Sequence, residues 1–203
     1  MLRGLWIGML AIATLASPAL AEDEDTWSFS LSAYSYLVND GKDYVSPLIT
    51  ADHGRLHLEG RYNYEDINTA SVFVGYAFDF GDELALNLIP MIGVVGGDTD
   101  GVAPGYRLNL TYKQFELYSE AEYLLDAHDH SDDFLYVWSE LNYHIDEAFR
   151  VGIAAQRTRV NDDFDLEPGL VVGFNWKKLS FAAYAFNPTE HDRTFVFAVG
   201  YSH

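Results

Sequence analysis

Charged and amide side chains stand at every second position in two runs of the sequence, 56–65 and 105–113, and mostly apolar residues lie between them. Successive side chains of a β-strand point to opposite faces, so each run has one polar and one apolar face. A helix fits neither run, because its apolar residues recur at intervals of three and four. The polar positions of the two runs include Glu59, Arg61, Asn63 and Glu65, and Arg107, Asn109 and Lys113.

Two later runs, 115–124 and 134–145, add carboxylates and an amide to such faces. Carboxylates and guanidinium groups on neighbouring strands can pair with each other and fill the space between them. They can also line a hydrated passage whose charged walls select small polar solutes. Both interpretations stay open from the sequence. The residues that these runs contribute are Glu116, Glu120, Glu122, Glu140 and Asn142.

The segment 128–133 offers imidazole, carboxylate and hydroxyl groups close together. Transition-metal sites need three or four converging ligands, and a loop segment fixes no such geometry. His128 and Ser131 are the nearest match to a hydrolase pair, but no oxyanion hole is evident beside them. The segment 97–101 is similar to a calcium loop, yet it lacks the further acids and the closing glutamate of an EF-hand. We therefore expect no metal, no cofactor and no catalytic residue.

The composition narrows the classes of partner. Asp and Glu total 31 against 12 Lys and Arg, which gives a net charge of −19. Nucleic-acid binding needs a basic face that neutralises phosphates, so we exclude it. The acidic excess serves solvation or attracts cations to external loops. The chain has no cysteine, so disulfides do not hold it together.

The first 21 residues have the order of a secretory signal peptide. Met1-Leu2-Arg3 is positively charged, 5–15 is mostly apolar, and 17–21 ends in small residues of the A-x-A type. The apolar stretch is too short for a membrane anchor, which needs about 20 residues. We expect cleavage after Ala21 and no membrane-spanning helix in the remaining chain.

Alternating runs continue from Trp27 to the end of the chain, and no linker marks a second domain. Residues 22–203 are therefore expected to form one all-β domain. Pro47 weakens the second run, because proline removes a donor from the ladder, and losing that hairpin would leave ten strands. The twelve expected strands are 27–38, 44–51, 55–65, 70–80, 84–94, 104–113, 115–124, 134–145, 148–158, 168–176, 179–186 and 194–202.

A secreted chain of alternating strands forms either a soluble barrel or sandwich with its apolar face inside, or a membrane barrel with this face outside. The joints between the strands favour the membrane. Short joints fall on one side and longer ones, such as 126–133 and 161–165, on the other, as in outer-membrane barrels. We predict a single closed antiparallel transmembrane β-barrel in the outer membrane of a Gram-negative bacterium.

The whole chain resembles small outer-membrane barrel proteins in its signal peptide, amphipathic strands, aromatic strand ends and aromatic-rich final strand. The resemblance implies contact with outer-membrane lipid, with lipopolysaccharide and with the barrel insertion machinery, which reads a terminal aromatic residue. Here the chain ends Tyr201-Ser202-His203, so this residue is displaced by two positions. Size and strand count look like those of the small twelve-stranded oligosaccharide channels, but no motif matches, and their lumens are basic.

Arg157 and Arg159 share one face of a strand near the expected outer rim. If they point inward, they form a basic patch that suits an anionic solute or a lipopolysaccharide phosphate. The alternative is pairing with Asp162, Asp163 or the inward glutamates.

These observations predict a small passive channel for polar solutes or ions. A closed structural barrel, whose acidic outer loops bind cations or partners, is the alternative. A lipase-type outer-membrane enzyme is the third hypothesis. The expected pore-lining residues are Glu59, Arg61, Asn63, Arg107, Asn109, Glu120, Glu122, Glu140 and Asn142.

Overall fold

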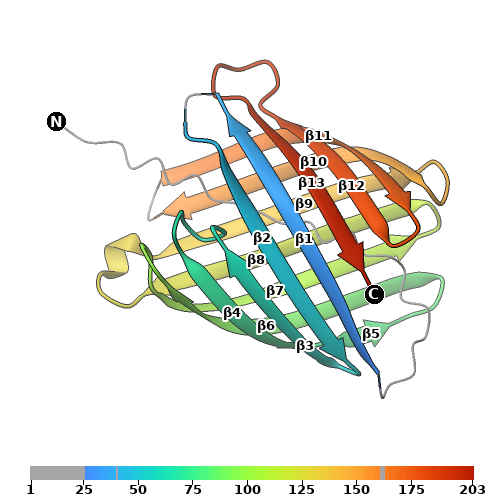
Figure 1. The fold of residues 1–203 in the computed structure, drawn as a ribbon, viewed down its shortest axis with the longest axis horizontal. Helices are drawn as coiled ribbons and strands as arrows, with labels where there is room; N and C mark the ends of the chain where they lie inside the picture. Colours follow the sequence, from blue (N-terminus) through green and yellow to red (C-terminus); the bar gives the residue numbers. More distant parts are fainter. Residues whose placement is uncertain (1–25, 40, 161–162) are drawn as a thin grey trace.

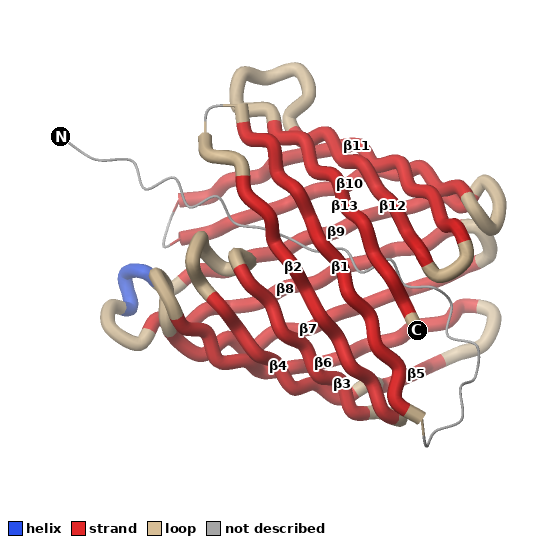
Figure 2. Tube along the Cα trace, in the orientation of Figure 1, coloured by secondary structure: helices blue, strands red, loops and turns tan. Residues whose placement is uncertain are grey.

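The computed structural model describes residues 26–39, 41–160 and 163–203, and the expected signal peptide lies outside them. These residues form a closed antiparallel β-barrel (Figure 1). Figure 2 shows that loops and a single 3₁₀ turn, η1 (His130–Asp132), lie at the ends of the barrel. Within the described residues, no helix is long and apolar enough to cross a membrane. The strands are β1 (Trp27–Val38), β2 (Tyr44–His53), β3 (Leu56–Tyr62), β4 (Ala70–Tyr76), β5 (Phe78–Phe80), β6 (Leu84–Gly96), β7 (Gly101–Tyr112), β8 (Phe115–Asp126), β9 (Phe134–His144), β10 (Phe149–Val160), β11 (Asp163–Trp176), β12 (Leu179–Phe186) and β13 (Thr194–Ser202).

The first and last strands close the barrel. β1 pairs with β2 on one side and with β13 on the other. β4 and β5 both pair with β6 in one continuous register, so together they make one spanning strand, interrupted at Ala77. The barrel therefore has twelve spanning strands, as predicted. Closure gives every strand a partner on both sides, which is the condition that a bilayer imposes on a sheet.

Four prolines, Pro47, Pro90, Pro104 and Pro168, lie within strands and face outward. Pro47 lies in β2 opposite Ala33 of β1, so the hairpin that it put in doubt is present and the ten-strand alternative is wrong. Pro90 of β6 faces the interruption between β4 and β5. Because proline has no N–H for the ladder, the pairing is broken there. On the side of β3 the ladder continues, and the N–H of Ala77 donates to the carbonyl of Arg55 at 2.8 Å.

Two strand boundaries differ from the expected ones. β3 ends at Tyr62 and does not continue to 65, because Asn63 has a φ of 53°. That left-handed conformation turns the chain out of the strand direction, and asparagine tolerates it better than most residues. β11 begins at Asp163, so the outer joint expected at 161–165 is shorter, and residues 161–162 lie outside the described part.

The outer surface of the barrel is apolar. Leu31, Ile49, Val72, Ile153 and Leu170 are each more than half exposed on it, while their sequence neighbours point into the barrel. A soluble barrel would bury such a face. The outer surface is therefore the one that faces lipid.

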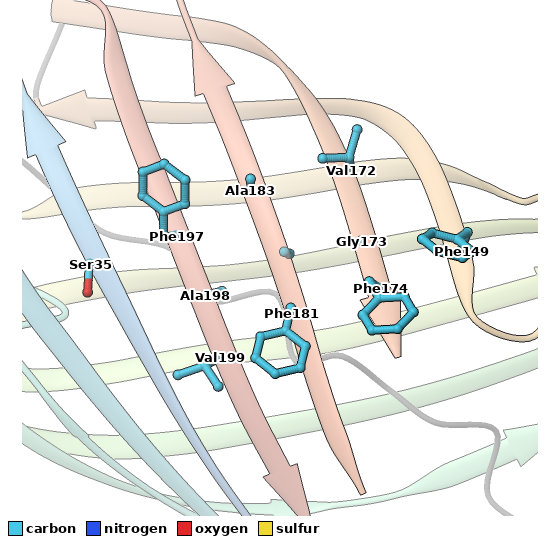
Figure 3. A pocket seen from close by; sticks show the side chains of 11 residues that line it. Ser35, Phe149, Val172, Gly173, Phe174, Phe181, Ala183, Phe197, Ala198 and Val199 are labelled. Atoms are coloured by element: carbon cyan, nitrogen blue, oxygen red, sulfur yellow. The ribbon is translucent and has the colours of Figure 1, made fainter. Parts of the chain in front are cut away.

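A shallow apolar groove of about 500 Å³ runs along this outer surface (Figure 3). Phe149, Phe174, Phe181 and Phe197 line it around the small side chain of Ala183. The groove thus belongs to the apolar outer surface and not to the lumen.

Leu170→Arg tests this orientation. Leu170 is 58% exposed near the middle of β11, so an arginine there would face hydrocarbon. We expect the free energy of unfolding from lipid vesicles to fall by about 2–4 kcal/mol, measured by urea titration of tryptophan fluorescence. Ile145→Arg, in an exposed turn at the membrane boundary, is the control and should cost about 0–1 kcal/mol. Equal losses in the two variants would contradict the assignment.

Candidate functional site in the barrel lumen

The interior side chains form three layers along the barrel axis. At the end with the shorter turns, polar side chains such as Asn87, Asn109 and His144 are partly exposed. Buried charges occupy the middle. Toward the longer loops, aromatic rings such as those of Tyr36 and Trp138 fill the interior. Short turns mark the periplasmic end of outer-membrane barrels, so the polar layer faces the periplasm.

We call the buried carboxylates and guanidinium groups of the middle layer the charge belt. They come from β3, β7, β8, β9 and β10 and from the loop that follows β3. Burying a charge is costly unless it is paired, so the pairing geometry decides what the belt can do. Its members are Glu59, Arg61, Glu65, Arg107, Glu120, Glu122, Glu140 and Arg150, all at most 6% exposed.

Arg61 holds three carboxylates together. Its Nη1 lies 2.7 Å from Oε2 of Glu122 and 3.7 Å from Oε1 of Glu65, and its Nε donates to Glu59. The guanidinium group also lies over the Tyr64 ring, 4.0 Å from its centroid. β3 and β8 are separated by β4, β6 and β7 in the sheet. The Arg61–Glu122 pair therefore spans the interior and does not join neighbouring strands.

Arg107 connects Glu59 of β3 to Glu120 of β8. Its Nη2 lies 2.7 Å from Oε2 of Glu59, and its Nε lies 3.6 Å from Oε2 of Glu120. Glu120 also accepts hydrogen bonds from the hydroxyls of Tyr64, at 2.6 Å, and Tyr118. Glu59 is thus shared between two arginines, and the network has no isolated charge at this point.

Glu140 is held mainly by neutral donors. It accepts from Trp138 Nε1 and the Tyr184 hydroxyl, each at 2.9 Å, and from Asn142 Nδ2 at 3.0 Å. Arg150 Nη2 lies 3.9 Å away, and neither this atom nor its Nε makes a hydrogen bond within the described residues. Hydrogen bonds to a charged group are stronger than neutral ones, so they fix the rotamers around Glu140.

Aromatic rings close the interior on the outer side of the charge belt. Tyr36 and Tyr44 stack with centroids 4.7 Å apart, and Tyr64 meets Tyr136 edge-on at 6.1 Å. Trp138 and Tyr136 are 0% exposed, so water does not reach them from either end. In the conformation of the structure, the aromatic layer and the charge belt together fill the lumen.

The periplasmic layer stays open to water. Glu116 and His144 lie 3.3 Å apart there and are partly exposed. The hydroxyl of Thr111 donates to Asn109 at 3.0 Å. This layer is a polar mouth that leads from the periplasm to the charge belt.

Most of the expected pore-lining residues lie in or beside the charge belt, but two do not. Asn63 lies in the turn after β3, where Nδ2 donates to the Val45 carbonyl at 2.9 Å and Oδ1 accepts from the Asn68 N–H at 2.8 Å. Asn109 lies in the periplasmic layer. The residues that do come together are Glu59, Arg61, Arg107, Glu120, Glu122, Glu140 and Asn142.

Arg150 and Tyr64 lie in the interior although neither was expected there. Arg150 precedes the small inward residues Gly152 and Ala154 on β10, and this alternation was the available signal. The alternation of the run 56–65 places Tyr64 on the apolar, outer face, but the left-handed turn at Asn63 ends this alternation. Its ring is 1% exposed inside the barrel.

Arg157 and Arg159 point outward, so the inward basic patch for an anionic solute does not form. Ala154 and Gln156 are buried and point into the barrel, so the alternating positions 157 and 159 point outward. Gln156 accepts a hydrogen bond from the Tyr136 hydroxyl at 3.3 Å inside the barrel. The guanidinium group of Arg157 lies over the exposed Phe164 ring on the outer surface, 4.6 Å from its centroid.

The histidine-rich loop between β8 and β9 is exposed. His128 Nδ1 lies 3.3 Å from Oδ2 of Asp100 in the adjacent loop. The backbone N–H of Ser131 donates to Asp129 and lowers the pKa of that carboxyl. Across the part of the chain that the structure describes, no group of three or more His, Cys, Asp or Glu side chains is arranged to hold a metal ion.

No family model and no curated protein sequence matches the chain, but solved structures match its fold. The KdgM porin superposes with a TM-score of 0.65 at 12% identity, over 85% of this chain and 98% of that one. The NanC porin gives 0.60 at 12% identity, over 85% and 97%. The outer membrane protein Omp33 of Acinetobacter baumannii gives 0.51 at 11% identity, over 86% and 97%. The fold is that of Gram-negative outer-membrane porins. With its apolar outer surface, this fold makes the chain an outer-membrane β-barrel protein.

Arg61→Met removes the cation that Glu59 and Glu122 share. Breaking a buried ion pair from one side leaves an uncompensated charge, so the free energy of unfolding should fall by about 3–5 kcal/mol. Urea titration of the barrel in vesicles measures this loss. Arg55→Met, in an exposed periplasmic turn, should change it by about 0.5 kcal/mol or less. An Arg61 variant as stable as the Arg55 variant would show that the belt does not hold the barrel together.

Glu65 makes the stability depend on pH. This residue lies in the loop between β3 and β4, and burial raises its pKa although Arg61 is nearby. The folded barrel therefore keeps a proton that the unfolded chain releases near its pKa of about 4.3, so stability is lost as pH rises above that value. Glu65→Gln removes this dependence. We expect its unfolding free energy, relative to the unmodified protein, to rise between about pH 4 and pH 8. A constant difference over this range would contradict the prediction.

Proposed function

We propose that the protein is a small passive channel of the outer membrane for polar solutes or ions, with the charge belt as its selective constriction. The observation that carries the proposal is the convergence of Arg61, Arg107 and their carboxylates at the middle of a barrel with the porin fold. Charged side chains around a constriction discriminate among ions and polar solutes.

The composition of the belt supports a preference for cations or neutral polar solutes. With Glu65 protonated, four carboxylates face three guanidinium groups, and the periplasmic mouth adds Glu116. One of the structures with this fold is the KdgM porin in complex with disordered oligogalacturonate. That complex supports solute binding by barrels of this fold. For the present protein, we infer the class of solute from the charges of the belt.

Passage requires the filled lumen to open. The belt and the aromatic layer are buried in the structure, so their side chains must separate before a solute can pass. We therefore expect a conductance far below that of wide porins, with brief openings.

A closed structural barrel is the second candidate. The 0% exposure of Trp138 and Tyr136 favours it, because such packing is typical of a core. The acidic outer loops would then provide the functional surface, through cations or partners that bind them.

Catalysis has the least support. Ser131 lies in the η1 turn and His128 pairs with Asp100 in an exposed loop, so no catalytic arrangement is evident.

The proposal further includes secretion through cleavage of residues 1–21. It also includes insertion by the barrel machinery through β13, and contact of the outer surface with lipid and lipopolysaccharide.

Single-channel conductance of residues 22–203, refolded into a planar bilayer, tests the channel. We expect discrete current steps and a reversal potential in a salt gradient that indicates cation preference. Glu120→Gln should weaken that preference and Arg107→Gln should strengthen it, because each removes one charge from the belt. Glu83→Gln, in an exposed periplasmic turn, is the matched control and should leave it unchanged.

The absence of current steps decides against the channel when the protein is shown to have inserted into the bilayer. Heat-modifiable mobility on gels establishes that the barrel has folded. Folded protein without current steps would overturn the channel and favour the closed barrel.

A further inference from the structure

The outward-facing strand positions carry almost no charge. They hold leucine, valine, aromatic and small residues, many of them well exposed. Among the outward strand positions that the structure describes, Arg157 and Arg159 are the only Asp, Glu, Lys or Arg. An arginine facing lipid is costly at the middle of a bilayer and nearly neutral at its surface. This pair therefore marks a special place on the outer surface.

Both arginines lie at the outer end of β10, which finishes at Val160. Arg159 stands opposite Leu135 on one side and Phe164 on the other. Two residues along a strand put the side chains of Arg157 and Arg159 about 7 Å apart on one face. They lie at the end of the strand that is nearest the outer loops.

The surroundings keep Arg157 on the outer surface. Its guanidinium group stacks on the Phe164 ring, and its Nε is buried without a hydrogen-bond partner within the described residues. Glu167 of β11 faces the lumen, where it accepts from Gln156. Its carboxylate is therefore on the other side of the sheet and is not placed to neutralise Arg157.

We propose that Arg157 and Arg159 bind a phosphate group of lipopolysaccharide in the outer leaflet. Guanidinium groups match phosphate oxygens in a bidentate geometry that lysine does not offer. Basic sites on other membrane proteins hold anionic lipid headgroups in this manner. The inference rests on the outer-membrane location in the proposed function and on its lipid contact, and it does not require an open lumen.

Lipid A binding to the protein extracted from outer membranes tests the site. Titration calorimetry in detergent micelles, together with native mass spectrometry, compares lipid A carrying both phosphates, dephosphorylated lipid A and inorganic phosphate. We expect the phosphorylated lipid to bind best. Arg157→Gln/Arg159→Gln should weaken this binding by about tenfold or more, because charge-assisted contacts are lost. Arg157→Lys/Arg159→Lys, which keeps the charge, should lie between the two.

Lys177→Gln/Lys178→Gln is the matched control. It removes the same two charges from the periplasmic turn between β11 and β12 and should leave lipid A affinity unchanged. Unchanged affinity in the Arg157→Gln/Arg159→Gln protein, or equal binding of dephosphorylated lipid A, would overturn the proposal. Complete displacement of the lipid by an equal concentration of inorganic phosphate would show a free-anion site and would also overturn it. Conductance is measured separately, so failure of the channel and failure of this site are distinguishable.

Discussion

Inside a bilayer, a backbone N–H or carbonyl group has no water to bond, so every one of them must find a partner in the protein. The pairing of β1 with β13 satisfies this condition at the two edges that the chain would otherwise leave open. The alternation of each strand then sorts the side chains, apolar ones to lipid and polar ones to the lumen. Pro47 and Pro90 obey the same condition, because the pairing of β2 with β3 stops before Pro47 and the pairing of β4 with β6 stops before Pro90.

The narrow lumen determines how the sorted charges are arranged. A barrel of twelve strands has little interior space, and large side chains such as Trp138 and Tyr184 take much of it. Glu59, Arg61 and Arg107 are consequently brought into contact. The same contacts that compensate buried charge also obstruct the lumen. Stability and permeability therefore depend on one set of residues, and a change that favours one works against the other.

The period of two in the sequence predicted nearly all of the strands, since each strand has one lipid-facing side. It also predicted that Glu59, Arg61, Glu120 and Glu140 share the interior. The ion-pair partners could not be predicted, because Arg61 meets Glu122 through the curvature and stagger of the closed sheet.

Local departures from the alternating pattern were the second reason why the interior residues could not all be predicted from the sequence. The left-handed turn at Asn63 gives no periodic signal, yet it places Tyr64 and Glu65 inside the barrel. The direction of Arg157 was also open, because the expected boundary of β10 lay close to it. Its observed direction follows from strand pairing that continues to Val160.

The pair between Arg61 and Glu122 also ties the burial of charge to the curvature of the sheet. Its members are 61 residues apart in the sequence and lie on strands that are not neighbours. The intervening hairpins must curve before these two groups can meet, so the contact forms late. A nascent, still open sheet therefore exposes the charges to water and is poorly suited to enter hydrocarbon. Only the curved sheet brings these groups together, so burial of the network depends on closure of the barrel.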